Sequence, residues 1–344
     1  MTRPAVSQAE SILRQRTPTP DAPAPPLLSV DRLTVDVATD TDPVRLVEDV
    51  SFTLAQGEVL GLVGESGCGK SVTAMSILRL LPEPPIRIAG GAVTFDGLDL
   101  AHMPKHRLRQ VRGSRIGMIF QEPMTSLNPT FSIGWQLDEA LRLHTGLRAA
   151  ARRARILEML RQVGIGAAEQ RLRQYPHELS GGLRQRVMIA MALACGPRLL
   201  IADEPTTALD VTVQLQILQL IGGLQRETGM AVLLITHDLG VISAFADRVA
   251  VMYAGRIIEV ADAAALFRQP RHPYTTALLA ARPRLSGARG ALAAIPGTVP
   301  PPAQRPPGCP YAARCPRADA RCTAAMPPLA GEAAHVVACW HPVS

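Results

Sequence analysis

The sequence predicts an α/β fold built on a buried parallel β-sheet, and three observations lead to it. Short, almost wholly apolar runs recur along the chain, as in strands that are buried on both faces. Segments with helical spacing of apolar residues separate these runs, which is the alternation that right-handed crossovers need. The chain has 344 residues, of which 47% are hydrophobic and 19% charged, enough for a core domain of about 250 residues with appendages.

Composition argues against several classes of protein. The apolar runs are far shorter than the roughly 18 residues that span a bilayer, so we do not expect an integral membrane protein. No apolar stretch that could serve as a signal-peptide core follows Arg3, Arg14 and Arg16, so we expect a cytoplasmic protein. The net charge of +7 fits anionic ligands or a membrane surface, while an aromatic content of 3% is poor for stacking nucleic-acid bases.

The first elements follow from proline content and burial patterns. We predict that residues 1–26 form a disordered tail, because the prolines of TPTPDAPAPP favour extended, unpacked backbone. From Leu27 the runs LLSV, LTVDV, VSFTL and EVLGLVG predict strands, the last of them buried on both faces. Further buried strands are predicted at residues 115–120, 198–203 and 231–237.

The rest of the chain divides into a helical part and a proline-rich part. Residues 129–175 carry apolar positions at helical spacing and no strand candidate, which predicts an all-helical insertion. The runs VAVMY and RIIEV flank Ala254 and Gly255, which predicts a hairpin. Ten prolines between Pro296 and Pro328 argue against long helices and central strands in the last segment.

The segment GESGCGKS matches the phosphate-binding pattern G-x-x-x-x-G-K-[ST]. It follows a predicted buried strand and precedes the helical run VTAMSILRL, as the mechanism requires. Its glycines let successive amide N–H groups and the helix N-terminus face phosphates, while Lys70 neutralises the β- and γ-phosphates and the Ser71 hydroxyl ligates magnesium. The expected phosphate-binding residues are Gly64, Glu65, Ser66, Gly67, Cys68, Gly69, Lys70 and Ser71.

Two further motifs indicate a functional site when they occur in the same chain as this phosphate loop. Asp203 and Glu204 end the apolar run LLIA, and we predict that Asp203 joins the magnesium shell while Glu204 acts as general base on a water. In LSGGLRQR, Ser180 can cap the following helix, and the amides of Gly181 and Gly182 form an anion site. Alone, the acidic pair would describe a polar strand end as well as a site, and LSGGLRQR would be better described as a well-capped helix.

The order of the motifs resembles the nucleotide-binding subunits of ABC transporters over residues 28–260. The motifs are the phosphate loop, Gln121, LSGGL, LLIADEP, Ala208-Leu209-Asp210 and His237. The resemblance implies an ATPase domain at residues 27–265, with a RecA-like core, an antiparallel β portion and a helical subdomain at about residues 126–180.

The resemblance also implies how ATP and Mg²⁺ are held. Two subunits would face each other head to tail, with each ATP between the phosphate loop of one and the LSGGL helix of the other. Gln121 would sense the γ-phosphate, ligate magnesium and link to the membrane subunits, Asp210 would cross the interface, and His237 would contact the γ-phosphate. Glu204, His237 and Gln121 are thus the expected catalytic residues.

Two positions depart from the family pattern. Leu183 stands where the LSGGQ motif has its glutamine, which removes one side-chain amide but leaves Ser180 and both glycines. Val37 stands where an aromatic residue usually stacks on adenine, so a contribution of about 1 to 3 kcal/mol is absent or comes from elsewhere.

Three features narrow the resemblance to the ATPase subunits of dipeptide, oligopeptide, nickel and glutathione importers. They are QEPMTSLNP at residues 121–129, RHPYT at residues 271–275 and the cysteines near the C-terminus. The resemblance implies that residues 266–344 are a C-terminal extension characteristic of peptide importers, with a cysteine cluster at residues 309–339.

The cysteines of this extension are Cys309, Cys315, Cys322 and Cys339. They include no C-x-x-C pair, so spacing alone does not indicate a zinc knuckle, and disulfides are not expected in reducing cytosol. The resemblance implies a 4Fe-4S cluster with four thiolate ligands, while zinc and unliganded thiols stay open as alternatives. Because the catalytic motifs lie elsewhere in the sequence, we expect ATP binding to survive each Cys→Ser change.

These features together predict the ATP-hydrolysing subunit of an importer for peptides or a related solute. The implied partners are a second, identical or related ATPase subunit, two membrane permease subunits and, indirectly, a substrate-binding protein, but no nucleic acid. The location would be peripheral, on the cytoplasmic face of the inner membrane. A soluble ABC-type ATPase acting on nucleic acid or ribosomes is the alternative, although residues 71–179 lack the sustained heptads of a coiled-coil insertion. A catalytically silent subunit is disfavoured because Glu204 and His237 are present.

Overall fold

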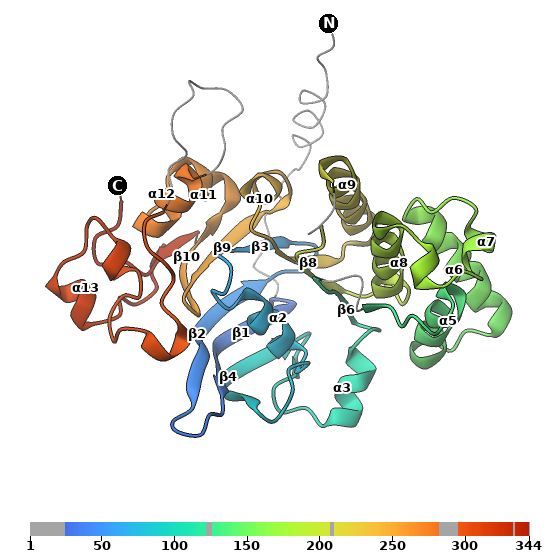
Figure 1. The fold of residues 1–344 in the computed structure, drawn as a ribbon, viewed down its shortest axis with the longest axis horizontal. Helices are drawn as coiled ribbons and strands as arrows, with labels where there is room; N and C mark the ends of the chain where they lie inside the picture. Colours follow the sequence, from blue (N-terminus) through green and yellow to red (C-terminus); the bar gives the residue numbers. More distant parts are fainter. Residues whose placement is uncertain (1–24, 122–125, 207–209, 282–294, 333, 344) are drawn as a thin grey trace, which may run out of the picture.

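The computed structural model describes residues 25–121, 126–206, 210–281, 295–332 and 334–343. The predicted tail, residues 1–26, therefore lies almost wholly outside the described residues. Two sheets occupy the middle of the molecule, a group of helices lies at one end and the C-terminal extension at the other (Figure 1). Among the described residues, no helix combines the length and the apolar character needed to cross a membrane.

The larger sheet contains the predicted buried strands. Its order is β11-β12-β10-β9-β3-β8-β7-β6, and the five strands from β9 to β6 are parallel. Every residue of β3, β7 and β8 is buried, which confirms the prediction from their continuous apolar runs. The strands are β3 (Val59–Val63), β6 (Ile116–Ile119), β7 (Leu199–Asp203), β8 (Ala231–Ile235), β9 (Arg248–Tyr253), β10 (Arg256–Asp262), β11 (Ala330–Glu332) and β12 (His335–Val337).

The smaller sheet is antiparallel, in the order β2-β1-β4-β5. Its strands are β1 (Leu28–Val37), β2 (Val44–Leu54), β4 (Ile86–Phe95) and β5 (Leu98–Asp99). The runs LLSV and LTVDV form one strand, β1, with a register shift around Arg32, whose φ is +48°. Opposite this irregularity a Cβ at Gly91 would come within 2.3 Å of the Arg32 carbonyl oxygen, so this position requires glycine.

Four of the described α-helices form a subdomain at one end of the molecule. The helical subdomain is drawn in green at one end of Figure 1 and contains α5 (Ile133–His144), α6 (Ala149–Gln162), α7 (Ala168–Arg171), the short η1 (Pro176–Glu178) and α8 (Gly181–Leu193). Residues 129–175 hold only helices, as predicted from their apolar spacing. The other described helices before residue 282 are α2 (Lys70–Ile77), α3 (Lys105–Val111), α9 (Val211–Thr228), α10 (Leu239–Phe245), α11 (Ala263–Arg268) and α12 (Pro273–Ala280).

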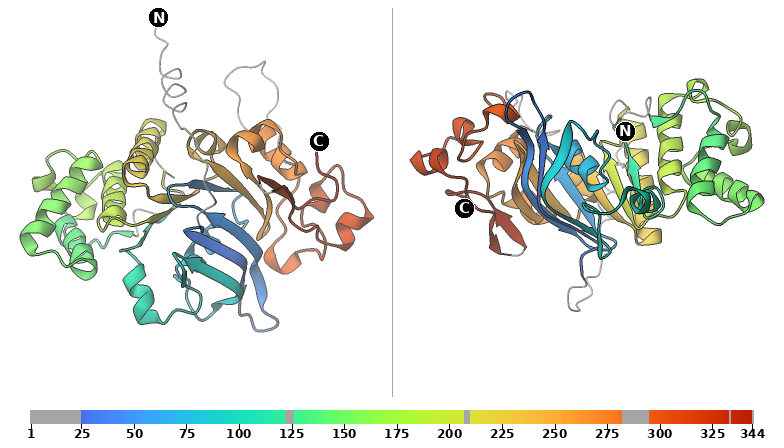
Figure 2. Two further views of the ribbon diagram at one scale, coloured as in Figure 1. Left: turned by 180° about the vertical axis from the view of Figure 1, so that it is seen from behind. Right: turned by 90° about the horizontal axis from the view of Figure 1, so that it is seen from below.

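Strand β3 explains why the molecule has a core on each face of the larger sheet. Val59 and Val63 join the core that includes the helical subdomain, whereas Leu60 and Leu62 join the core shared with the smaller sheet and α2. This alternation follows from the pleat, which points successive side chains to opposite faces. Helix α2 is consequently held between the two sheets, with contacts to β1, β2 and β7 (Figure 2).

The C-terminal extension is built onto the larger sheet. It contains η2 (Pro302–Gln304), η3 (Ala312–Arg314), α13 (Ala320–Ala324) and strands β11 and β12, of which β11 forms the edge of the sheet. Strand β12 pairs antiparallel with β10, with Glu259 opposite Val337. Residues 296–328 contain only short helices and no strand, which agrees with the limits that their prolines set. The predicted boundary between residues 265 and 266 falls inside α11.

Candidate functional site

The phosphate loop joins β3 to α2 in a conformation that only its glycines allow. A Cβ at Gly64 would lie 2.2 Å from the carbonyl oxygen of Met252, so any other residue would displace the β9–β10 hairpin. Lys70 donates from its Nζ to the carbonyl oxygens of Gly64, at 2.8 Å, and Glu65, at 3.1 Å. The lysine thus bridges the start of the loop from the first turn of α2.

The N-terminus of α2 is arranged for an anion. Gly69 precedes the helix in the left-handed conformation, with a φ of +107°, and no side chain caps the first turn. The uncapped amide N–H groups therefore face the concave side of the loop, as in phosphate sites. Cys68 is fully buried and burial raises the pKa of its thiol, so this side chain packs beneath the loop while its backbone shapes it.

Ser71 and Asp203 form the predicted magnesium pair. The Ser71 hydroxyl donates to Oδ1 of Asp203 at 3.1 Å, joining the start of α2 to the end of β7. Asp203 is 4% exposed, and burial raises the pKa of its carboxyl, with the neighbouring Glu204 adding to the effect. Hydroxyl and carboxylate oxygens are ligands that Mg²⁺ prefers, so the donor set fits this ion.

Three predicted catalytic residues meet at the carboxyl ends of neighbouring strands. Gln121 follows β6, Glu204 follows β7 and His237 follows β8. The amide of Gln121 donates to Oε2 of Glu204 at 3.2 Å, and Nδ1 of His237 lies 3.5 Å from Oε1 of the same carboxylate. The His237 side chain is 66% exposed, so its ring stands open to a ligand above the strand ends. This arrangement suits activation of a water beside a γ-phosphate.

The LSGGL residues lie apart from the phosphate loop within one chain. The Ser180 hydroxyl accepts from the Leu183 N–H at 3.4 Å and caps α8, as predicted. Helix α8 packs on α5, α6 and β6, whereas α2 lies between the two sheets. Gly181 has open space where a Cβ would stand, and Gly182 faces Val213. The LSGGL segment and the phosphate loop therefore lie at the N-termini of two different helices, α8 and α2.

Asp210 and Val37 have local roles that the motifs did not reveal. Oδ1 of Asp210 accepts from the N–H groups of Thr212 and Val213 at 3.0 Å and caps α9. Ala208 and Leu209, which precede it in the predicted motif, lie outside the described residues. Val37 is the last residue of β1, half-buried, and pairs with Val44 and Ile86.

Comparison with known families adds to this geometry. Residues 47–207 match the ABC transporter family, and residues 258–322 match the oligopeptide/dipeptide transporter C-terminal region. The dipeptide transport ATP-binding protein DppD of Bacillus subtilis is 50% identical over 315 residues, 91% of this chain and 94% of the relative. This chain belongs to the ABC transporter ATP-binding subunits, in the oligopeptide/dipeptide branch.

Further similarities place this ABC subunit among ATP-hydrolysing cassettes. DppD of Escherichia coli is 49% identical over 303 residues, 88% of this chain and 92% of the relative. The dimeric ATP-binding cassette MJ0796, solved with ADP and Pi, has a TM-score of 0.62 and 28% identity over 69% of this chain and 98% of that one. The chain is an ATPase of this family, and its fold is the cassette fold that the motif order predicts.

The extension of this ABC subunit brings its four cysteines to one cavity. Cys309, Cys315, Cys322 and Cys339 all line it, and none of the four is in a disulfide. Burial raises the pKa of Cys309 to about 11, and the neighbouring thiols contribute in the same direction. The sequence resemblance named these residues, and the structure shows that they converge although their spacing is irregular.

Three residues of the extension and α12 were absent from the sequence-based site. His272 also lines the cysteine cavity, Tyr274 contacts the phosphate loop, and Arg314 pairs with Glu65 of that loop. The signals were the RHPYT segment, which identified the branch without a residue role, and the arginine immediately before Cys315. Neither the RHPYT segment nor this arginine shows, from the sequence alone, which distant part of the chain its side chains contact.

Proposed function

We propose that this chain powers an ABC importer for peptides or a related small solute such as nickel or glutathione. The convergence of Gln121, Glu204 and His237 beside the Ser71–Asp203 pair carries the proposal, because it assembles a metal pair and a general base above a phosphate loop. The names of the relatives, which describe dipeptide transport, supply the solute class. The chain itself would not bind the solute.

Each residue of the site would have its own role in binding or hydrolysing ATP. Backbone amides of the phosphate loop and Lys70 bind the β- and γ-phosphates, and Ser71, Asp203 and Gln121 hold Mg²⁺, which supplies charge neutralisation on the phosphate oxygens. Glu204 accepts the proton of the attacking water, and His237 contacts the γ-phosphate. The open side of His237 supports this role, since the ring is accessible above the strand ends.

A second ATPase subunit, identical or related, would complete the site. Ser180, Gly181 and Gly182 lie apart from the phosphate loop of their own chain. Gly181 is exposed, and the N–H groups of both glycines lie at the start of α8. In a head-to-tail pair these groups would reach the ATP of the partner, and Asp210 would lie at the interface. The dimeric MJ0796 cassette supports this arrangement by similarity.

The helical subdomain offers a surface for the two membrane permease subunits. Phe131 and Trp135 are exposed and stacked, with ring centroids 3.9 Å apart, and Leu143 is 66% exposed nearby. These side chains line a groove that also includes Ser126 and Met191. Exposed apolar side chains around a groove are typical of docking sites, so we infer that a permease helix binds here and holds the subunit peripherally on the cytoplasmic face of the inner membrane.

The cysteine cavity fits a 4Fe-4S cluster. Four sulfur donors converge on one cavity, which is the soft ligand set that iron-sulfur clusters use. Nδ1 of His272 accepts the Tyr274 N–H at 3.0 Å, so the ring proton lies on Nε2, which is buried and has no partner among the described residues. An unpaired buried donor costs about 1 to 3 kcal/mol, and a sulfur acceptor in the cavity would satisfy it.

The cluster, when bound, would supply iron–sulfur bonds that tie together segments with little core of their own. The residues then hold it: Cys309, Cys315, Cys322 and Cys339 as ligands and His272 as a hydrogen-bond donor. Zinc is the competing occupant, because Asp319 and His341 bring carboxylate and imidazole donors within 4.8 Å of the Cys322 thiol.

Reconstitution tests the transport function. The chain, its second ATPase subunit, both permeases and the substrate-binding protein would be assembled in vesicles, and ATP turnover measured with and without solute. We expect several-fold stimulation by dipeptides, oligopeptides, nickel or glutathione. Stimulation by RNA or ribosomes in place of every solute would support the alternative of a soluble ATPase and contradict the proposal.

A further inference from the structure

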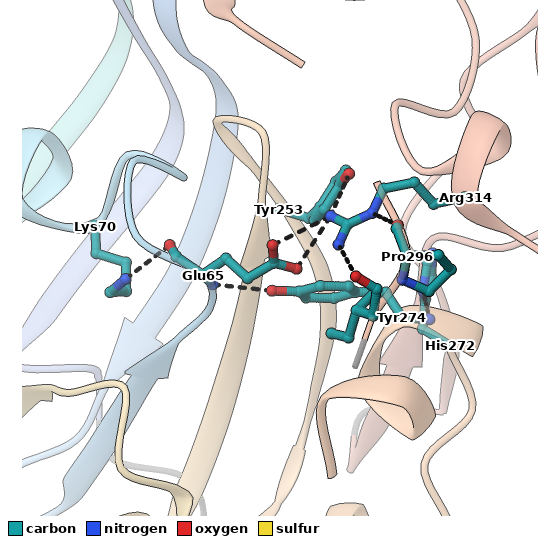
Figure 3. A network of polar contacts seen from close by, with 8 residues as sticks. Glu65, Lys70, Tyr253, His272, Tyr274, Pro296 and Arg314 are labelled. Carbon is teal, nitrogen blue, oxygen red and sulfur yellow. Dashed lines mark hydrogen bonds and ion pairs between the residues drawn. The ribbon is translucent and has the colours of Figure 1, made fainter. Parts of the chain in front are cut away.

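The second residue of the phosphate loop is held from the C-terminal extension. Nη1 of Arg314 lies 3.1 and 3.2 Å from the two carboxylate oxygens of Glu65 and 3.1 Å from the hydroxyl of Tyr253 (Figure 3). The Arg314 side chain is 6% exposed and the Glu65 side chain 27%, so this ion pair is partly shielded from water on the arginine side. The extension thus reaches the phosphate loop through the guanidinium of Arg314 as well as through the hydroxyl of Tyr274.

Arg314 is itself fixed in place. Its Nε donates to the carbonyl oxygen of Pro296 at 2.7 Å, and its guanidinium lies 5.8 Å from the ring centroids of Tyr253 and Tyr311. It ends η3, directly before Cys315 of the cysteine cavity. A guanidinium held on several sides has little freedom to follow Glu65, so Glu65 must adapt to it.

The backbone of Glu65 is held as well. Its N–H donates to the hydroxyl of Tyr274 at 2.9 Å, and its carbonyl oxygen accepts from Lys70. Tyr274 is fully buried on α12, and its ring packs against Tyr253 and Tyr311. The residue is therefore fixed at its N–H, its carbonyl and its carboxylate, from three separate parts of the chain (Figure 3).

We propose that Arg314 is a positioning residue for ATP binding, acting through Glu65. Fixing Glu65 holds the loop in the curved form in which its amides face phosphates, so less order is lost when ATP binds. Arg314 also neutralises a carboxylate that would otherwise repel the triphosphate at the edge of the loop. ATP affinity therefore depends on a residue of the extension.

Equilibrium titration of the full-length subunit with a non-hydrolysable ATP analogue and Mg²⁺ tests this inference. Arg314→Ala should raise the Kd about 5- to 50-fold, within the usual range for coupled sites. Turnover at saturating ATP should change by less than about twofold, because Glu204 and His237 keep their places. Arg314→Lys, which keeps the charge, should restore part of the affinity.

Matched variants separate positioning from a general loosening of the extension. Arg321→Ala removes a guanidinium that stacks on Trp340 at 3.6 Å in the same extension, and the Kd should stay unchanged. Tyr274→Phe removes only the hydroxyl that accepts the Glu65 N–H and should raise the Kd, whereas Tyr311→Phe in the same aromatic cluster leaves the Glu65 contacts in place and should not. These conservative changes remain informative even if Arg314→Ala folds poorly.

A double-mutant cycle gives the decisive result. If Arg314 acts through Glu65, the Arg314→Ala, Glu65→Gln double variant should bind the analogue no more weakly than Arg314→Ala alone. Independent, multiplying effects of the two changes would overturn the inference. So would a wild-type Kd for Arg314→Ala, or an equal loss in Arg321→Ala. None of these outcomes depends on which solute is transported.

Discussion

Glu204 combines a strained backbone with two polar contacts. Its φ is +46°, unusual for a residue with a side chain, and its N–H donates to the carbonyl oxygen of Ile235 on β8. Gln121 and His237 both approach its carboxylate. Strain of this kind persists where the surrounding structure fixes a side chain for a task, and here it directs the carboxylate over the strand ends.

The general-base role of Glu204 can be tested by an isosteric change. Glu204→Gln keeps the hydrogen-bonding shape but cannot accept a proton, so turnover should fall by about 10² to 10⁴ while ATP binding is retained. The measurement is phosphate release by the assembled complex, with Lys70→Ala as a contrast that should weaken binding itself. Wild-type turnover in Glu204→Gln would assign the base to another residue.

Val37 gives a prediction about base selectivity. Without an aromatic platform at the end of β1, adenine should add little to affinity, and GTP should bind nearly as well as ATP. Titration with both nucleotides measures the difference. A preference for ATP above about tenfold, or 1.4 kcal/mol, would mean that another side chain stacks on the base.

At the scale of elements, helix α12 depends on a buried histidine. His272 caps the helix through Nδ1, and burial lowers its pKa to about 3. Because the unfolded chain binds this proton at an ordinary pKa near 6.5, folding stability is complete above that value and falls as pH drops toward 3. The loss amounts to about 2 kcal/mol at pH 5.

A matched variant isolates this pH dependence. Asparagine is a good cap without a titrating ring, so His272→Asn should keep α12 and remove the histidine contribution between pH 7.5 and pH 5. Denaturant unfolding at both pH values measures it. Equal pH dependence in the two proteins would show that folding does not shift the pKa of His272.

Elements that can be recognised from their own residues, without knowledge of distant contacts, were predictable from the sequence. Strands β3, β7 and β8 are continuous apolar runs, and the loop, Asp203 and Glu204 follow directly from them. The prediction of two strands for β1 was wrong, because the bulge at Arg32 interrupts the pattern without ending the strand. Strand β4 escaped prediction, since Gly90 and Gly91 weaken its β pattern.

Contacts made by distant segments could not be predicted. Strand β12 is three residues long and exists because β10 offers an edge to pair with. Tyr274 and Arg314 reach Glu65 only after the sheet has brought α12 and η3 to the loop. The sequence names such residues by type, while their partners depend on the tertiary fold.

At the scale of the whole molecule, the extension and the nucleotide site are not independent. We expected ATP binding to survive each Cys→Ser change because the cysteines lie far from the catalytic motifs in the sequence. That reason does not take account of segments that meet in the folded chain. Arg314 lies next to Cys315 and contacts the loop. Since Arg314 positions Glu65 from this extension, releasing the extension should weaken ATP binding to about the same degree as Arg314→Ala.

The occupant of the cysteine cavity can be identified directly. Anaerobic purification followed by iron, acid-labile sulfide and zinc analysis and visible absorption should give one 4Fe-4S cluster per chain. Cys→Ser at any of the four positions should lower the iron content and make the extension sensitive to protease, because its folding is coupled to the cluster. Zinc in place of iron, or a metal-free extension of equal protease resistance, would reject the cluster.

The pairing of β12 with β10 has a consequence for solubility. Residues 257–261 of β10 are all buried, and β12 covers the edge that would otherwise expose their backbone. An uncovered apolar edge strand is a template for pairing with other chains, and detachment would also leave the fully buried Glu259 without its partner His335. A chain truncated at residue 281 should therefore accumulate in inclusion bodies. If the proposed iron-sulfur cluster holds the extension in place, the full-length subunit should do the same in cells starved of iron.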